Sequence, residues 1–397
     1  MKIVVIHEVN YLTKLIYEYQ IIPEILASSG HEVIVIDYDE TWRDTSGRIW
    51  QGARVHGDVS RTHSSGKVTV RRPGMIRLPL LSRLSGAVAN GAEVFREVAR
   101  SKTDLILLYG VPTVGVQALL AARFFKVPIF FRSIDVMHQL APSRLLSAVT
   151  GFLERIVYKR MDGVIALTPR LKTYIQSYGV PEERVRVLPS GVDVGMFQSG
   201  EKNKAILRRW GVEADDPVIL FMGTIYRFSG LDRVISDLRM LLPRYPHAKL
   251  LVVGHGEDEA RLKEIAARCE VSANVIFTGL QPYADLPDII RAADVCINPF
   301  ELNSITKDIL PTKLFQYLAC GRPVLATELP GMLPFLPGER CGVLYSSLAE
   351  FVASLGTLLG DSEWCQRLGV AGESAMRENY QWSHIAATML EQIAEMS

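Results

Sequence analysis

A helix that begins at Pro311-Thr312-Lys313 would form a binding site for an anion. Proline suits the first turn of a helix, where its missing N–H costs no hydrogen bond. The free N–H groups of that turn and the positive end of the helix dipole attract negative charge, such as that of a diphosphate. Lys313 would add a cation there, and a lysine on the solvated surface is the alternative. Helix amides and cations can take the place of Mg²⁺, so this chemistry demands no metal.

Polar side chains also follow two apolar runs in the first half of the sequence. Arg132, Asp135 and His138 come after the run Ile129–Phe131. If that run is a parallel strand, its carboxyl end is where such folds bind ligands. A histidine that caps a helix is an equally good interpretation of His138. The pair His7-Glu8 follows the first apolar run in the same way, and it could be no more than a polar strand end.

The loop from Gly223 to Gly230 follows another apolar run and contains one cation, Arg227. A guanidinium group can hold a diphosphate through two parallel hydrogen bonds. The hydroxyl groups of Thr224 and Ser229 could donate to the same ligand. The alternative for Arg227 is a solvated position at the rim.

Apolar runs of strand length alternate with helical patterns along the whole chain, which predicts β/α units with parallel sheets. The 397 residues exceed the roughly 250–300 that one hydrophobic core supports. Two doubly wound domains are therefore expected, with the turn-rich segment 189–193 between them and a charged helix over 201–216 leading into the second. The predicted strands are 3–6, 33–36, 68–70, 105–108, 129–131, 164–167, 185–188, 218–222, 250–253, 275–277, 295–297, 324–326 and 342–344.

The composition is that of a globular protein, with 48% hydrophobic and 22% charged residues, which excludes disordered and collagen-like classes. Residues 1–190 contain 25 Lys and Arg against 17 Asp and Glu, a net charge of +8, and the remainder has a net charge of −7. The basic half suggests an anionic partner. The five cysteines lack metal-binding spacing and predict free thiols. No segment is apolar enough for a membrane span, and the first residues suggest a strand instead of a signal peptide.

The sequence resembles glycosyltransferase family 4 over nearly its whole length. The order and spacing of several short segments carry this resemblance: Ser28-Ser29-Gly30-His31-Glu32-Val33, Leu167-Thr168-Pro169, Pro189-Ser190-Gly191-Val192-Asp193, Phe221-Met222-Gly223, Val252–Glu257, Phe277-Thr278-Gly279, Ala292–Val295 and Leu314–Val324. It implies the GT-B fold, in which two Rossmann-like domains face each other across a cleft.

The resemblance also assigns the candidate site. Two family glutamates, eight positions apart, fall on Asp308 beside the donor sugar and on Gln316 beside the ribose. The implied donor-binding residues are Gly223, Thr224, Arg227, Ser229, Gly254, Leu280, Pro311, Thr312, Lys313 and Gln316. The implied catalytic residues are Asp135, His138 and Asp308, and His7, Glu8 and Arg132 would lie on the acceptor side.

The sequence departs from the family at several of these positions. Thr224 and Ser229 replace an arginine and a lysine that usually face the donor phosphates. Ile134 stands where many relatives have a histidine, and His138 could take over its contacts. Gln316 lacks the charge of the usual glutamate but can still accept a hydrogen bond from a ribose hydroxyl.

These features predict a retaining enzyme that transfers a sugar from a UDP- or GDP-linked donor to a lipid-linked or saccharide hydroxyl, without a cofactor. Residues 1–190 would bind the acceptor and residues 191–380 the donor. Two alternatives remain open, a nucleotide-sugar epimerase with the same fold and a non-catalytic donor-binding subunit. Neither the sugar, the nucleotide, the linkage nor the oligomeric state follows from the sequence.

The segment Arg71–Arg83 interleaves arginines with apolar residues, as a surface that rests on anionic lipid does. A loop with solvated arginines is the equal alternative. The expected location is cytoplasmic, with peripheral attachment to the inner face of the cell membrane left open, and no nucleic-acid-binding motif is present.

The final helix is expected over about 381–397, with Ser383 as its N-cap. Ile385, Met389, Leu390 and Ile393 recur at helical spacing and need an apolar partner. In the family this partner lies on the amino-terminal domain. A helix that only completes the second domain is the alternative.

Overall fold

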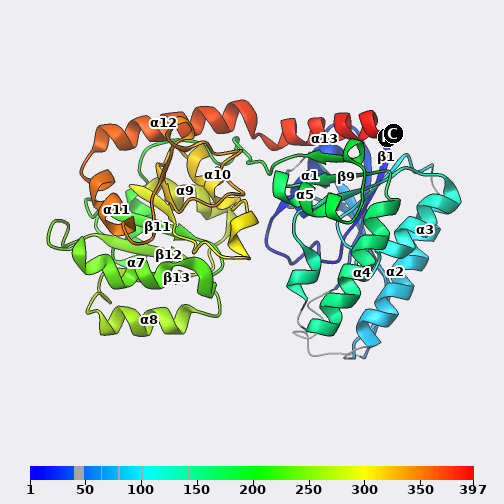
Figure 1. The fold of residues 1–397 in the computed structure, drawn as a ribbon, viewed down its shortest axis with the longest axis horizontal. Coiled ribbons are helices and arrows are strands. Elements are labelled where there is room, and N and C mark those ends of the chain that lie inside the picture. The colour runs from blue at the N-terminus through cyan, green and yellow to red at the C-terminus, as the bar shows by residue number, and fades with distance from the viewer. Residues whose placement is uncertain (40–48, 64, 79–80, 101, 142) are drawn as a thin grey trace. The chain divides into compact units, whose positions relative to one another are not determined.

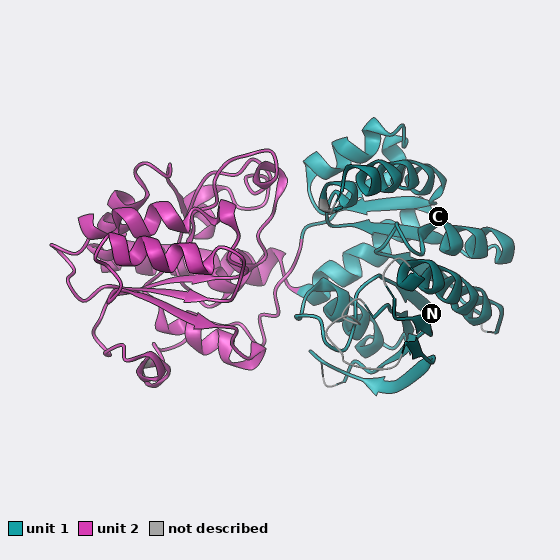
Figure 2. Ribbon diagram, turned by 90° about the horizontal axis from the view of Figure 1, so that it is seen from below, with its two compact units in different colours: residues 1–189, 382–397 teal, residues 190–381 magenta. Residues whose placement is uncertain are grey.

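The computed structural model describes residues 1–39, 49–63, 65–78, 81–100, 102–141 and 143–397. These residues form two compact units (Figure 2). Unit 1 contains residues 1–189 and 382–397, and unit 2 contains residues 190–381. The chain therefore leaves unit 1 once and returns to it with its last helix.

Unit 1 is built on an eight-stranded sheet with the order β10-β9-β8-β7-β1-β2-β5-β4. Only the edge strand β4 runs antiparallel to its neighbour, and the other strands are parallel. The sequence analysis missed β4, because it is mostly exposed and lacks an apolar run. The strands are β1 (Lys2–Ile6), β2 (Glu32–Ile36), β4 (Arg54–Val59), β5 (Val68–Arg72), β7 (Leu105–Leu108), β8 (Ile129–Ser133), β9 (Gly163–Ala166) and β10 (Val185–Val187), and β3 (Trp50–Gln51) pairs separately with β6 (Met75–Ile76).

The helices of unit 1 cover both faces of this sheet (Figure 1). From β1 to β2 the chain moves toward one edge of the sheet, and from β7 through β8 to β9 it moves toward the other edge. Because such crossovers are right-handed, the helices of these two connections lie on opposite faces of the sheet. Helix α2 packs beside α3 and α3 packs beside α4, whereas α1 packs beside α13. The helices are α1 (Glu18–Ser28), α2 (Leu81–Arg100), α3 (Gly115–Phe125), α4 (Arg144–Arg160), α5 (Pro169–Ser177) and α13 (Trp382–Met396).

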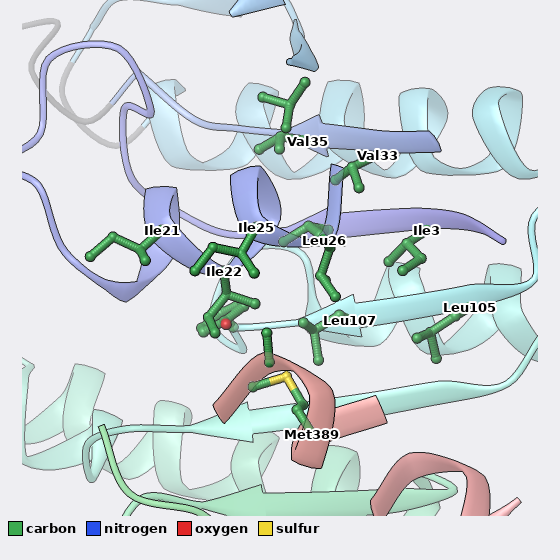
Figure 3. Packing of buried hydrophobic residues seen from close by; sticks show 14 of the residues in the cluster. Ile3, Ile21, Ile22, Ile25, Leu26, Val33, Val35, Leu105, Leu107 and Met389 are labelled. Carbon is green, nitrogen blue, oxygen red and sulfur yellow. The ribbon is translucent and has the colours of Figure 1, made fainter. Parts of the chain in front are cut away.

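Helix α13 completes the hydrophobic core of unit 1 (Figure 3). Its buried residues Ile385, Met389 and Ile393 join the cluster that contains Ile22 of α1 and Leu107 of β7. The helix begins at Trp382, one residue before the predicted cap Ser383. The preceding residue, Gln381, instead forms a β-bridge with Val192 in unit 2.

Unit 2 contains a six-stranded parallel sheet with the order β13-β12-β11-β14-β15-β16. The helix predicted over 201–216 is much shorter, because α6 passes into a 3₁₀ turn that ends at Gly211 with φ of +67°. None of the described helices of the chain is long and apolar enough to cross a membrane. The elements of unit 2 are β11 (Val218–Met222), β12 (Lys249–Val253), β13 (Val275–Gly279), β14 (Val295–Asn298), β15 (Val324–Ala326), β16 (Val343–Tyr345), α6 (Lys204–Leu207), α7 (Leu231–Asp237), α8 (Glu259–Arg268), α9 (Leu286–Ala292), α10 (Lys313–Ala319), α11 (Phe351–Leu359) and α12 (Ser362–Asn379).

Candidate functional site

Two glycines bring neighbouring strand ends of unit 2 into close contact. Gly223 follows β11 and Gly254 follows β12, and their φ angles of +137° and +135° favour glycine. A Cβ atom on Gly254 would lie 2.0 Å from the carbonyl oxygen of Gly223. Gly254 is therefore required for the close contact between the two loops, and both loops present backbone at this edge of the sheet.

Lys313, the first residue of α10, lies at the same edge. Its Nζ atom is 3.8 Å from the ring centroid of Phe221 and 4.3 Å from that of Phe300. A Cβ atom placed on Gly223 would be 3.6 Å from this Nζ atom. Lys313 is only 9% exposed, and burial lowers its pKa well below the usual range.

The Lys313 amino group forms no ion pair with a carboxylate of a described residue, and burial is the one cause of its lowered pKa. Aromatic faces attract an ammonium group, but they do not replace the water that burial removes. The site therefore lacks a negative charge that a ligand can provide.

Helix α10 contributes less to this anion site than the sequence predicts. It has seven residues and begins at Lys313, so Pro311 precedes the N-cap Thr312 and lies outside the first turn. The Thr312 side chain makes no capping hydrogen bond. A helix this short has a weak dipole, which leaves Lys313 as the main positive group.

The loop after β11 presents two of its polar side chains to solvent and buries the third. Thr224 and Arg227 are exposed, whereas Ser229 is 1% exposed. The Ser229 hydroxyl is buried without a hydrogen-bond partner among the described residues. Gly230 fixes the end of the loop, because its φ is +68° and a Cβ atom would lie 1.8 Å from the Pro299 carbonyl oxygen.

Asn298 is a polar residue of this edge that the sequence analysis missed. It ends β14 and is fully buried, yet neither its Oδ1 nor its Nδ2 atom has a hydrogen-bond partner in the described part of the chain. The signal was available, since an asparagine directly follows the apolar run Val295–Ile297. Buried amides without partners are rare in folded proteins, and such a group often marks a ligand or water site.

The remaining donor-side candidates are more exposed than Lys313. Asp308 is half-buried and ends a 3₁₀ turn over Thr306–Asp308. Gln316 is half-buried on α10 and forms a hydrogen bond with Tyr283, a tyrosine whose pKa burial raises. Leu280 follows β13 and is 63% exposed.

Arg132 differs from the expectation that it faces a ligand. The side chain is completely buried and forms an ion pair with Glu18, with Nε–Oε1 at 2.5 Å and Nη2–Oε2 at 3.0 Å. Its Nη1 group also donates to the carbonyl oxygen of Leu188 at 2.8 Å. Arg132 thus joins β8, α1 and the end of β10 inside unit 1.

His138 belongs to a hydrogen-bonded network with a buried glutamate. Its Nδ1 atom is 2.9 Å from Oε2 of Glu154 and 2.9 Å from the Tyr174 hydroxyl. A hollow of about 550 Å³ lies beside the imidazole, lined by His138, Gln139, Ala141, Ser143, Arg144, Ser147, Ala148 and Gly151. Asp135 lies in the loop before His138 and is exposed.

His7 and Glu8 are held by contacts within unit 1. Burial lowers the pKa of His7 to about 4, and its ring stacks on Tyr11. Glu8 accepts hydrogen bonds from the backbone N–H groups of Thr113 and Val114 at the start of α3, at 2.6 and 3.2 Å. Both side chains therefore make contacts at the end of β1, while the buried Nε2 atom of His7 has no hydrogen-bond partner among the described residues.

The segment Arg71–Arg83 is not the free cationic surface that its sequence suggests, because its arginines form ion pairs with carboxylates of the same unit. The pairs are Arg71 with Glu93 and Glu97, Arg72 with Asp37, Arg77 with Asp39, and Arg83 with Glu8. Met75 is buried. Residues 79–80 lie outside the described chain.

These ion pairs also occupy Asp37-Tyr38-Asp39, an Asp-x-Asp pair after β2 that the sequence analysis overlooked. Asp37 pairs with Arg72, and Asp39 accepts a hydrogen bond from Asn10 at 3.1 Å. Across the described residues, no group of three or more His, Cys, Asp or Glu side chains could hold a metal ion. The five cysteines are free thiols.

Two family models match the chain in succession. Residues 24–195 match "Glycosyltransferase Family 4", and residues 216–361 match "Glycosyl transferases group 1". The chain belongs to glycosyltransferase family 4. The second match includes Gly223, Gly254 and Lys313, so the sheet edge that these three residues form lies within the segment that matches the group 1 model.

The similarity to solved structures extends over nearly the whole chain. The HepE protein of Anabaena in complex with UDP and glucose has a TM-score of 0.74, with 99% of each chain covered and 15% sequence identity. This similarity shows the α/β GT-B fold with two Rossmann-like domains.

Two curated relatives are similar over shorter segments. D-inositol 3-phosphate glycosyltransferase of Segniliparus rotundus is 29% identical over 221 residues, which cover 54% of this chain and 48% of the relative. Alpha-monoglucosyldiacylglycerol synthase of Streptococcus pneumoniae is 25% identical over 264 residues, which cover 63% of this chain and 57% of the relative. The chain thus spans about half the length of these relatives.

Proposed function

We propose that the protein is a retaining glycosyltransferase that transfers a sugar from a UDP- or GDP-linked donor to a hydroxyl of a lipid-linked or saccharide acceptor. The observation that carries this proposal is the buried Lys313 ammonium group, which has no carboxylate partner in the described chain. A nucleoside diphosphate supplies the missing charge, and it leaves as an anion when the sugar is transferred. A cation that meets the developing charge lowers the barrier of that step.

The polar groups of unit 2 suit both the phosphates of such a donor and its sugar and ribose. The missing side chain at Gly223 leaves room for a phosphate group close to Lys313. The Thr224 hydroxyl and the exposed Arg227 can donate to the same phosphates from the adjoining loop. Asp308 can accept hydrogen bonds from sugar hydroxyls, and Gln316 can do so from the ribose.

Unit 1 would bind the acceptor, with Asp135 and His138 as the groups nearest its reacting hydroxyl. The contact with Glu154 fixes the His138 ring through Nδ1 and leaves Nε2 for a sugar hydroxyl. One relative is named for transfer to D-inositol 3-phosphate and another for the synthesis of alpha-monoglucosyldiacylglycerol, which favours glycolipid or cell-surface polysaccharide assembly. Retention of configuration follows from family membership.

A donor panel tests this function against its two rivals. Radiolabelled UDP- and GDP-sugars are incubated with the full chain, with and without a membrane extract as the source of acceptors. A labelled lipid or saccharide product supports transfer, whereas a changed sugar on the free donor means an epimerase. Donor binding in calorimetry without either product would mean a non-catalytic binding subunit.

A further inference from the structure

Three neighbouring helices of unit 1 carry an unusual number of exposed apolar side chains. Helices α2, α3 and α4 lie next to one another on one face of the sheet (Figure 1). Leu81, Leu84, Val88, Leu120, Phe124, Leu145, Leu146, Val149 and Phe152 are all exposed there, and we call this set the three-helix face. The exposed fractions of Val88, Phe124 and Leu145 reach about three quarters.

The charged residues of these helices are segregated by sign. Their three acidic residues, Glu93, Glu97 and Glu154, are all buried. Their exposed charged residues are all basic, namely Arg83, Arg96, Arg100, Arg123, Arg144, Arg155, Lys159 and Arg160. Ion pairs with carboxylates engage Arg83, Arg96 and Arg123, and the other five form no ion pair with a described residue.

The longest helix of unit 2 provides a contrast within the same chain. On α12 the exposed charges are Glu363, Arg367, Arg377 and Glu378, so both signs are present. Its one exposed large apolar residue is Val370. Exposed leucines and phenylalanines among bases, without exposed acids, therefore distinguish the three-helix face from α12.

We propose that the three-helix face rests on an anionic lipid bilayer. The apolar side chains would enter the boundary between headgroups and acyl chains, and the unpaired bases would contact lipid phosphates. Charge complementarity favours this partner over a second copy of the chain, because two such faces would bring like charges together. Nucleic acid is less suited, since its phosphates give Leu145 or Phe152 no apolar environment.

This surface shares only Leu81 and Arg83 with the segment Arg71–Arg83, whose arginines are engaged in internal ion pairs. Bilayer binding by the three-helix face does not depend on the proposed function. One consequence does rest on that function, namely that unit 1 would meet a lipid-linked acceptor at the bilayer. The hollow beside His138 is lined partly by Arg144, Ser147 and Ala148 of α4, so one helix would contribute to both the bilayer contact and the candidate acceptor site.

Vesicle flotation with the full chain tests the proposal. We expect binding to vesicles of 70% phosphatidylcholine and 30% phosphatidylglycerol, and at least tenfold weaker binding to pure phosphatidylcholine. The variant Phe124→Asn/Phe152→Asn should lose at least tenfold in affinity for the anionic vesicles. The matched control Met240→Asn/Val370→Asn changes two apolar residues of unit 2 that are about two thirds exposed, and it should bind like the wild type. Unchanged melting temperatures would show that both variants fold.

A second variant separates the charges from the apolar contacts. Arg155→Gln/Lys159→Gln/Arg160→Gln should weaken binding at low salt and reduce its dependence on salt concentration. Equal binding of the wild type to both kinds of vesicle, or full binding by the phenylalanine variant, would overturn the proposal. A wild-type dimer that the phenylalanine variant converts to a monomer, without vesicle binding, would assign the face to a second copy.

The readouts keep this inference apart from the proposed function. Nucleotide binding and transfer to a soluble acceptor without vesicle binding would refute the membrane surface alone. Vesicle binding without binding of UDP or GDP would refute the transferase alone.

Discussion

The carboxyl ends of the two sheets differ in how they hold their buried charged groups. In unit 1 these charges pair with one another, as in the pair Arg132–Glu18 and the pair Arg72–Asp37, although the buried Nε2 atom of His7 and the buried hydroxyl of Ser133 have no hydrogen-bond partner among the described residues. In unit 2, Lys313, Ser229 and Asn298 are buried without such partners among the described residues. A closed network stabilises the loops that contain it, whereas an incomplete one is ready for a ligand. The edge of unit 2 is therefore organised for binding, and the edge of unit 1 for support.

The largest expected effect is the loss of stability when the buried ion pair of unit 1 is broken. Arg132→Met leaves the Glu18 carboxylate buried without its cation, which should destabilise unit 1 by about 3–5 kcal/mol. Hydrogen exchange measured by mass spectrometry would show this as faster exchange in β7 and β8 than in β11.

Two further variants serve as controls. One tests whether lost packing explains the effect, and the other tests the removal of an arginine from an ion pair elsewhere. The double variant Arg132→Met/Glu18→Met removes both charges and should recover much of the stability. Arg261→Met breaks a partly exposed pair with Asp258 in unit 2 and should cost less than about 1 kcal/mol. Equal costs for Arg132→Met and Arg261→Met would contradict the contrast between the two sheets.

Lys313→Met should give the next largest effect, and on activity instead of stability. Methionine keeps the packing on Phe221 and Phe300 but removes the charge that meets the leaving diphosphate, so transfer should fall by roughly 10²-fold. The melting temperature without ligand should stay the same or rise, because a desolvated cation is lost. Lys263→Met, on the surface of α8, is the control. Activity within a few-fold of wild type would place Lys313 outside the donor site.

Acid should weaken unit 1 through His7. Burial lowers the pKa of this imidazole from 6.5 to about 4, so the unfolded chain takes up a proton that the folded unit excludes. Stability is therefore complete above pH 6.5 and falls as the pH drops toward 4, with a loss of about 2 kcal/mol at pH 5. Urea unfolding at pH 7.5 and pH 5 measures this loss. The variant His7→Gln should lose less stability over the same interval, and an identical loss would assign it to other groups.

The smallest expected effect concerns Arg227, an exposed cation near the ligand site of unit 2. Arg227→Ala should weaken the binding of UDP or GDP by about fivefold, as expected for a solvated charge pair. Calorimetry with the preferred nucleotide measures the change, and Arg233→Ala on α7 is the matched control. No difference between these two variants would mean that the phosphates are held without Arg227.

The strands were predictable because a parallel strand covered on both faces is a continuous apolar run. The edge strand Arg54–Val59 lacks such a run, and the helix expected over 201–216 ends at Gly211, where the left-handed conformation stops it. Local sequence thus predicted the buried elements better than the exposed ones.

The site was less predictable because its contacts join distant residues. Glu18 pairs with Arg132 across 114 positions, and only the fold shows that this arginine is internal. The arginines of Arg71–Arg83 looked free for the same reason. Lys313 was predictable from family spacing, but its aromatic surroundings depend on Phe221, which lies 92 positions earlier.

The return of helix α13 to unit 1 has a consequence for synthesis on the ribosome. Residues 190–381 form a continuous segment, so unit 2 can fold as soon as they have emerged. Unit 1 begins to emerge first, but its core lacks Ile385, Met389 and Ile393 until residues 382–397 are translated. The half of the protein that is made first is therefore the half that is completed last.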